Sequence, residues 1–299
     1  MLTDAFYWLL NMSIVASVAG MVILLLRLIP RLPRRFIYPL WAIVLVRLYV
    51  PFGFASDFSI LKLLPHKSVT FPGFTDSIPG ANAIMAADDY FPIVFNTGSS
   101  GLLFTIASAV WVTVAVILLL IELTSYVQSI RQCRCATHWK DQIYISERIC
   151  GPIVVGIFRP RILLPRDYEG RDLELILTHE RIHILRLDNL WRLIGLTVAC
   201  MHWFNPLVWL FLKYFLIDME LSCDEVVLHK LSPQQQTDYA RTLLSSVQRQ
   251  SLLLSPFGHA PTSQRIRNIL SYRRLSTAAA LFLSVAAACI CVILLTNAQ

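Results

Sequence analysis

Four apolar stretches constrain the fold of this chain more than any other feature. A helix that crosses a bilayer needs about 20 mostly apolar residues, and residues 5–26, 102–123 and 275–296 meet that requirement. Residues 36–52 form a shorter stretch and carry Arg47, whose long side chain can reach the headgroups from near a helix end. We expect all four stretches to span a membrane. The alternative for residues 36–52 is a buried or interfacial helix.

The composition agrees with a membrane protein. Of the 299 residues, 56% are hydrophobic and 15% are charged, whereas soluble domains are about 45–50% apolar and about 25% charged. This excludes a disordered chain or an ordinary soluble protein. The net charge of +7 would by itself suggest nucleic acid, but excess Arg and Lys in a membrane protein more often reflects topology. We expect the lipid bilayer as a partner and no direct contact with nucleic acid.

The charges of the loops predict the orientation. The first connection carries four arginines, whereas residues 53–100 carry more Asp than Lys. Because basic loops stay in the cytoplasm, we expect a multi-pass cell-membrane protein with both termini outside. The predicted parts are a transmembrane hairpin (1–52), an extracellular loop (53–100), a third span (101–124), a cytoplasmic domain (125–274) and a fourth span (275–299).

The cytoplasmic segment begins with short strands and continues with helices. Residues 143–149 alternate apolar and polar side chains, as a half-buried strand does. Residues 153–158 and 161–164 are further strand candidates, separated by Gly and Pro. From Asp172 onward the apolar spacing is helical. The segment is therefore predicted to be an α+β domain.

One motif in this segment points to chemistry. His179-Glu180-x-x-His183 lies in a helical pattern, so the two imidazoles are four residues apart and share one face. Two such histidines can bind one Zn²⁺, and the glutamate beside them can act as a general base. The alternative is a surface helix with two polar histidines.

A catalytic zinc site uses three protein ligands, so a further residue is needed. Glu220 lies in a second helical stretch and is our candidate for the third ligand. Asp224, on the same face, is predicted to hold a ligand histidine, or to form a local salt link. Asp188 either supports His183 or is a polar residue at a helix end. Glu225 is expected on a solvated face.

Geometry restricts the segment between the two motifs. Residues 193–212 are apolar enough to resemble a fifth span, but a span would place His179 and Glu220 on opposite sides of the membrane. A reversal is needed, and Asn205-Pro206 supplies it. We therefore expect a helical hairpin that does not cross the bilayer. His202 is expected to be packed rather than to bind metal.

The remaining basic residues suggest contacts with water or lipid. Arg181, Arg186 and Arg192 are expected to be solvated or to contact lipid phosphates. Four arginines precede the last apolar stretch and suit anionic lipid, namely Arg265, Arg267, Arg273 and Arg274.

With these motifs in place, the chain resembles the BlaR/MecR-type membrane metallopeptidases, antirepressors of beta-lactam resistance. The resemblance covers nearly the whole chain. It rests on His179-Glu-Arg-Ile-His183 with Asp188, His202-Trp-Phe-Asn-Pro206, Glu220-Leu-Ser-Cys-Asp224, Gly151–Pro165 and Arg265-Ile-Arg-Asn-Ile-Leu270.

The resemblance implies an α-helical membrane protein with four transmembrane helices and an inserted gluzincin-like zinc metallopeptidase domain. It implies His179, His183 and Glu220 as zinc ligands and Glu180 as general base. It also implies proteolytic signalling, through self-cleavage within about residues 250–272 or through relief of a cytoplasmic DNA-binding repressor. Because the sequence ends at Gln299, we expect it to lack the penicillin-binding sensor domain of the family.

Two other functions remain open. One is a housekeeping membrane gluzincin that clears damaged membrane proteins, and the other is a signal transducer whose zinc site only stabilises the domain. The protein substrate is unidentified from the sequence, and a homo-oligomer is compatible with it.

Overall fold

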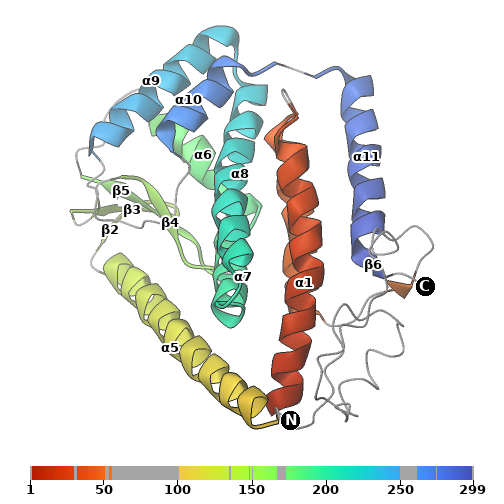
Figure 1. Ribbon diagram of the computed structural model, residues 1–299. Coiled ribbons are helices and arrows are strands. Elements are labelled where there is room, and N and C mark those ends of the chain that lie inside the picture. Colours follow the sequence, from red (N-terminus) through yellow and green to blue (C-terminus); the bar gives the residue numbers. More distant parts are fainter. Residues whose placement is uncertain are drawn as a thin grey trace.

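The structure, a computed structural model, describes residues 2–29, 32–50, 54–55, 101–134, 136–147, 149, 151–166, 173–249, 261–273 and 275–297. It is mostly helical, with a four-stranded mixed sheet and, in the described residues, a two-stranded parallel pair of β1 and β6 (Figure 1). The helical elements are α1 (Leu2–Arg27), α2 (Arg34–Ile37), the 3₁₀ turn η1 (Tyr38–Leu40), α3 (Trp41–Tyr49), α5 (Gly101–Arg134), α6 (Leu173–Leu185), α7 (Asp188–Met201), α8 (Pro206–Lys230), α9 (Pro233–Arg249), α10 (Thr262–Leu270) and α11 (Thr277–Leu295). The strands are β1 (Phe54–Ala55), β2 (Thr137–Lys140), β3 (Ile143–Ser146), β4 (Ile153–Val155), β5 (Arg161–Pro165) and β6 (Thr296–Asn297).

Three helices in the described ranges are long and apolar enough to cross a membrane. They cover Ala5–Arg27, Phe104–Arg131 and Thr277–Leu295, which agrees with three of the four expected stretches. The fourth stretch forms α2, η1 and α3, and α3 has only 9 residues. The second span therefore stays a prediction. Nearly all of the expected extracellular loop, and residues 250–260 of the expected self-cleavage stretch, lie outside the described residues.

The sheet has the strand order β2-β3-β5-β4, with β3 and β5 parallel and the other pairs antiparallel. All three expected strand regions contain a strand, but the first ends at Ser146 and the second at Val155, each three residues earlier than expected. The chain turns at Gly156, where φ is +95° and a Cβ atom would lie 2.9 Å from the carbonyl oxygen of Arg159. Strand β4 is left at the edge of the sheet.

The expected helical hairpin is confirmed in α7 and α8. Helix α7 ends at Met201 and α8 begins at Pro206, where the side chain of Asn205 accepts the N–H of Leu207 at 2.9 Å. Gly195 permits the two helices to approach closely, because a Cβ atom there would lie 3.1 Å from Leu212 Cδ1. His202 is fully buried and bonds the carbonyl of Leu48 at 2.9 Å, as a packed histidine does.

Helix α8 runs beside α1 and contacts α6, α7 and α10 (Figure 1). Apolar residues of its first half join α1, α3 and α7 in the largest core cluster, including Phe211, Phe215 and Met219. This cluster packs the expected transmembrane hairpin directly against the helix that carries Glu220.

Two buried carboxylates of α8 hold the connection that follows α1 against this helix. Asp218 of α8 is fully buried and accepts hydrogen bonds from Arg27 Nε at 2.8 Å and from Trp41 Nε1 at 2.8 Å. Seven residues further along α8, Glu225 accepts the backbone N–H groups of Arg34 and Arg35 at 2.9 and 3.1 Å. The expectation that Glu225 is solvated was wrong: it is only 3% exposed, because the first turn of α2 docks on it and needs an acceptor.

Replacing Asp218 with Asn is expected to destabilise the protein by about 3 kcal/mol, because breaking a buried ion pair leaves the Arg27 charge uncompensated. The free energy of unfolding in detergent measures this change. Asp238→Asn is the matched control, since Asp238 pairs with Arg241 on the surface, and an exposed pair contributes about 0–1 kcal/mol. Equal stability of the two variants would contradict the proposed importance of the buried pair.

Candidate metal centre

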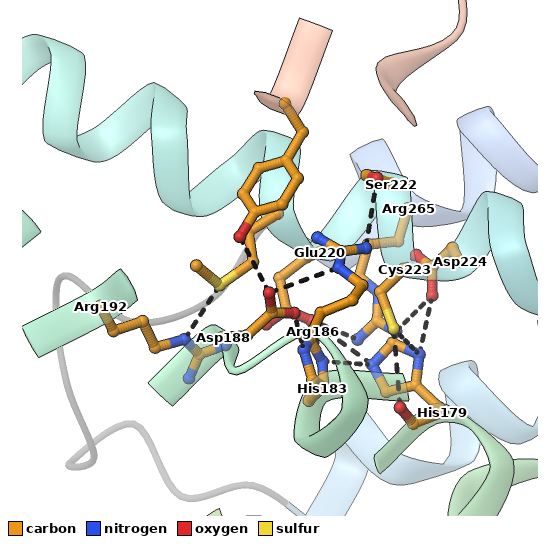
Figure 2. A network of polar contacts seen from close by, with 12 residues as sticks. His179, His183, Arg186, Asp188, Arg192, Glu220, Ser222, Cys223, Asp224 and Arg265 are labelled. Atoms are coloured by element: carbon orange, nitrogen blue, oxygen red, sulfur yellow. Dashed lines mark hydrogen bonds and ion pairs between the residues drawn. The ribbon is translucent and has the colours of Figure 1, made fainter. Parts of the chain in front are cut away.

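Helix α6 places the two motif histidines side by side. His179 and His183 are 6% and 7% exposed, and their Nε2 atoms are 3.0 Å apart. Their rings lie edge to face, with centroids 4.7 Å apart. Two imidazole nitrogens at this distance, both buried, can share one cation (Figure 2).

Glu220 approaches the same point from α8. Its Oε2 atom lies 3.6 Å from His179 Nε2 and 3.7 Å from His183 Nε2. Around a tetrahedral zinc ion with bonds of about 2.0–2.1 Å, neighbouring ligand atoms lie roughly 3.3 Å apart. Two imidazoles and one carboxylate at these separations fit the donor set of a zinc site. Glu180 lines the cavity that these three side chains face.

Cys223 is a second candidate for the third ligand, and the sequence analysis did not single it out. Ligand atoms of His179, His183 and Cys223 lie within 4.8 Å of one another, and all three residues are buried. The Sγ atom, however, is 3.5 Å from Nδ1 of His179, the nitrogen opposite to the one that faces His183. The carboxylate of Glu220 faces both Nε2 atoms and is the better placed donor.

Asp188 fixes the orientation of His183. Its Oδ2 atom accepts a hydrogen bond from His183 Nδ1 at 2.6 Å, which leaves Nε2 free to bind a metal. The other carboxylate oxygen accepts the hydroxyl of Tyr38 at 2.8 Å and lies 3.3 Å from Arg186 Nε. Asp188 therefore lies where a residue supporting a ligand would lie. Arg186 is paired with it rather than solvated.

Asp224 and Tyr239 lie on the Nδ1 side of His179, and Tyr239 was not among the residues expected from the sequence. The Tyr239 hydroxyl donates to Asp224 Oδ1 at 2.6 Å and lies 2.9 Å from His179 Nδ1. Arg265 donates to both oxygens of Asp224, at 2.6 and 2.8 Å. The N–H at Nδ1 of His179 can thus donate a hydrogen bond to the Tyr239 oxygen, while the Tyr239 hydroxyl donates its hydrogen bond to Asp224. This order leaves Nε2 of His179 without a proton, so it can accept; Arg265 Nη2 lies 3.3 Å from it.

Two arginines that were expected to contact water or lipid lie in this centre instead. Arg192 donates to Oε1 of Glu220, and Arg265 lies 3.7 Å from Oε2. Arg265 is largely buried because the fold brings α10 back onto α8. An expectation based on distance from the last apolar stretch could not detect this return. For Tyr239, the sequence indicated nothing beyond a place on the apolar face of α9.

The charges around Glu220 favour its ionised form. Burial alone would raise the pKa of Glu220, but His183, His179 and Arg192 hold that pKa well below its usual range. Burial alone would lower the pKa of His183, but Cys223, Glu220 and the hydrogen bond that His183 donates to Asp188 hold that pKa well above its usual value. An ionised carboxylate and two imidazole rings at one point are donor types that a zinc ion takes when the imidazoles are neutral.

A cavity of about 390 Å³ opens in front of the metal centre. Its walls come from α5, β4, α6, α7, α8, α9 and α10, including Glu122, Ser125, Val154, Glu180, Arg192 and Tyr239. Asn189 donates to the carbonyls of Val154 and Gly156 at 3.0 and 3.2 Å. This bond pair holds the edge strand beside the metal centre.

Membrane-length apolar helices combined with a His-Glu-x-x-His helix in a cavity are the features of a membrane metallopeptidase. A family model described as BlaR1 peptidase M56 matches residues 7–271. The chain therefore belongs to this metallopeptidase family, as the sequence resemblance indicated.

Curated relatives are regulatory and resistance proteins. The chain is 33% identical over 151 residues to the "Regulatory protein BlaR1" of Bacillus licheniformis, covering 48% of this chain and 25% of that protein. It is 26% identical over 106 residues to the "Methicillin resistance mecR1 protein" of Staphylococcus aureus, covering 34% of this chain and 18% of that protein. A MecR1 protein of Staphylococcus epidermidis matches to the same extent. The matches span a quarter or less of these relatives' lengths.

Tyr38→Phe is expected to weaken zinc binding by a few-fold, up to about tenfold. Mutating a group that bonds a ligand directly, as Asp188 bonds His183, typically costs 10–100-fold in affinity, and Tyr38 acts one hydrogen bond further away. The measurement is competition for zinc against a chelator, which does not depend on activity. Tyr49→Phe is the matched control, since Tyr49 is 65% exposed in the same hairpin. An unchanged affinity in Tyr38→Phe would show that Asp188 needs no support from Tyr38.

The third ligand is identified by comparing Glu220→Gln with Cys223→Ser. We expect Glu220→Gln to lose stoichiometric zinc, because an amide is a poor zinc donor, and Cys223→Ser to keep it. Metal content of the purified variants is measured by atomic emission, and circular dichroism confirms that both remain folded. The reverse result would assign the third position to Cys223.

Proposed function

We propose that this chain is an integral-membrane zinc metalloendopeptidase of the BlaR/MecR type that transduces a signal by proteolysis. The observation that carries the proposal is the convergence of His179, His183 and Glu220 on one point of a cavity that Glu180 also lines. The names of the relatives support a regulatory role.

The chemistry follows from the residues around the cavity. A zinc ion, when bound, polarises the scissile carbonyl and makes water more acidic. Glu180 takes the proton of the attacking water and delivers it to the leaving amine. Asp188 and the Tyr239–Asp224 pair hold the two ligand imidazoles in the required tautomers.

The edge strand β4 is the proposed seat of the substrate. It lies at the rim of the sheet and lines the cavity with residues 153–155. An extended peptide can add to a sheet edge through main-chain hydrogen bonds, with alternate side chains entering pockets; here it would share the carbonyls of Val154 and Gly156, which already accept from Asn189. The bonds from Asn189 keep this edge at a fixed position relative to α6 and α7.

The membrane arrangement belongs to the same proposal. Four spans place the gluzincin-like domain of residues 125–274 in the cytoplasm and both termini outside, in agreement with the basic first connection. The substrate is then a cytoplasmic protein such as a DNA-binding repressor, or the chain itself near residues 250–272. A homo-oligomer fits this scheme.

Glu180→Gln tests the proteolytic role. We expect cleavage of the chain itself and of fluorogenic casein to fall by at least about 10²-fold, because a general base contributes 10²–10⁴-fold. Cleavage is followed by mass spectrometry of products in membranes, and zinc content is measured in parallel.

Glu174→Gln is the matched control, since Glu174 is an exposed glutamate in the first turn of the same helix. Unchanged cleavage in Glu180→Gln would reject the assignment. A non-proteolytic transducer would be favoured by a different result. In that case neither the unmutated chain nor Glu180→Gln would cleave a substrate, and both would keep full zinc content and signalling.

A further inference from the structure

A buried carboxylate lines the cavity away from the metal ligands. Glu122 lies on α5, within the stretch expected to cross the membrane, and its side chain is among the cavity walls at 8% exposure. Ionisable residues inside membrane helices are costly and usually face a protein interior or a water-filled cavity. Glu122 therefore occupies a position that packing alone does not explain.

The partner of Glu122 is neutral. The Thr197 hydroxyl lies 3.1 and 3.2 Å from its two carboxylate oxygens, and in the described parts of the chain Glu122 forms no ion pair. Glu220, in the same cavity, is paired with Arg192 and Arg265. A buried ionised carboxylate needs a cation to offset its lost hydration, and no described residue supplies one to Glu122.

The surroundings of Glu122 suit a long cationic side chain. Ser125, Tyr126 and Ser129 extend the same wall of α5 with uncharged polar groups, while Leu193 and Leu196 supply apolar surface. Lys and Arg bury an aliphatic stem along apolar surface and place the charge at its end. The cavity of about 390 Å³ falls within the range of ligand-binding pockets.

We propose that Glu122 forms a subsite that receives a lysine or arginine side chain of the peptide bound at the metal centre. The inference rests on the proposed function only in that a peptide is the occupant of the cavity. The subsite gives the protease a preference for substrates with a basic residue near the scissile bond.

The test measures binding, so it does not require cleavage. Full-length Glu180→Gln protein is placed in neutral phosphatidylcholine nanodiscs, which excludes attraction of basic peptides to anionic lipid. Casein-derived peptides bearing lysine at successive positions are compared with the same peptides bearing norleucine, using fluorescence anisotropy. We expect lysine at one position to tighten binding about tenfold over norleucine.

Adding Glu122→Gln to this protein is expected to abolish the difference between lysine and norleucine. Glutamine has nearly the same shape and can still accept the Thr197 hydroxyl, and thermal unfolding checks that the fold is retained. Adding Glu174→Gln instead removes a similar charge outside the cavity and should keep the difference. A lysine preference that survives Glu122→Gln, or no preference at any position, overturns the subsite.

The two proposals fail separately. If lysine peptides bind preferentially through Glu122 but the unmutated chain cleaves nothing, the subsite stands and the proteolytic function is lost. If the chain cleaves casein with Glu180 required, yet lysine and norleucine peptides bind equally, the protease stands and Glu122 has a purely structural bond to Thr197.

Discussion

The pairing of four buried carboxylates on α8 is the constraint on which the rest of the structure depends. Asp218, Glu220, Asp224 and Glu225 lie within two turns of one helix and are all nearly inaccessible. An unpaired buried charge costs several kcal/mol, so each must find donors. The donors come from six helices. Helices α1 and α3 supply Arg27 and Trp41 for Asp218, and α7 supplies Arg192 for Glu220. Helices α9 and α10 supply the donors for Asp224, and α2 supplies those for Glu225. Charge pairing thus assembles these segments around the metal centre.

The sequence predicts those features that depend on short spacing. The two histidines are four residues apart, Asp188 follows His183 by five, and Asn205-Pro206 marks the reversal that returns Glu220 to α6. Features that depend on distant partners left no signal. Arg265 is 41 residues from Asp224 and Tyr38 is 150 residues from Asp188. A charged residue is predicted to be solvated when its partner is unknown. The expectations for Glu225, Arg186, Arg192 and Arg265 were wrong for this reason.

The expected transmembrane hairpin is part of the metal centre rather than a separate anchor. Tyr38, in the turn before α3, bonds Asp188, which in turn holds His183. The same turn stacks on Phe215 of α8 with ring centroids 5.7 Å apart. A displacement of this hairpin must therefore either carry α8 and Asp188 with it or break the bond that orients a ligand. The position of Asp188 and of α8 is therefore linked to the position of the segment that carries Tyr38.

Glu220 and Glu122 are two buried carboxylates in one cavity that differ in what compensates their charge. Glu220 faces two imidazoles and two guanidinium groups, so its charge is compensated by the protein and its position is fixed. Glu122 has one hydroxyl, so its compensation has to come from a proton or from whatever enters the cavity. Glu220 is paired by residues brought from distant segments, whereas Glu122 faces the space where a peptide would lie. This difference in pairing is why we assign Glu220 to the structure of the site and Glu122 to recognition of the bound peptide.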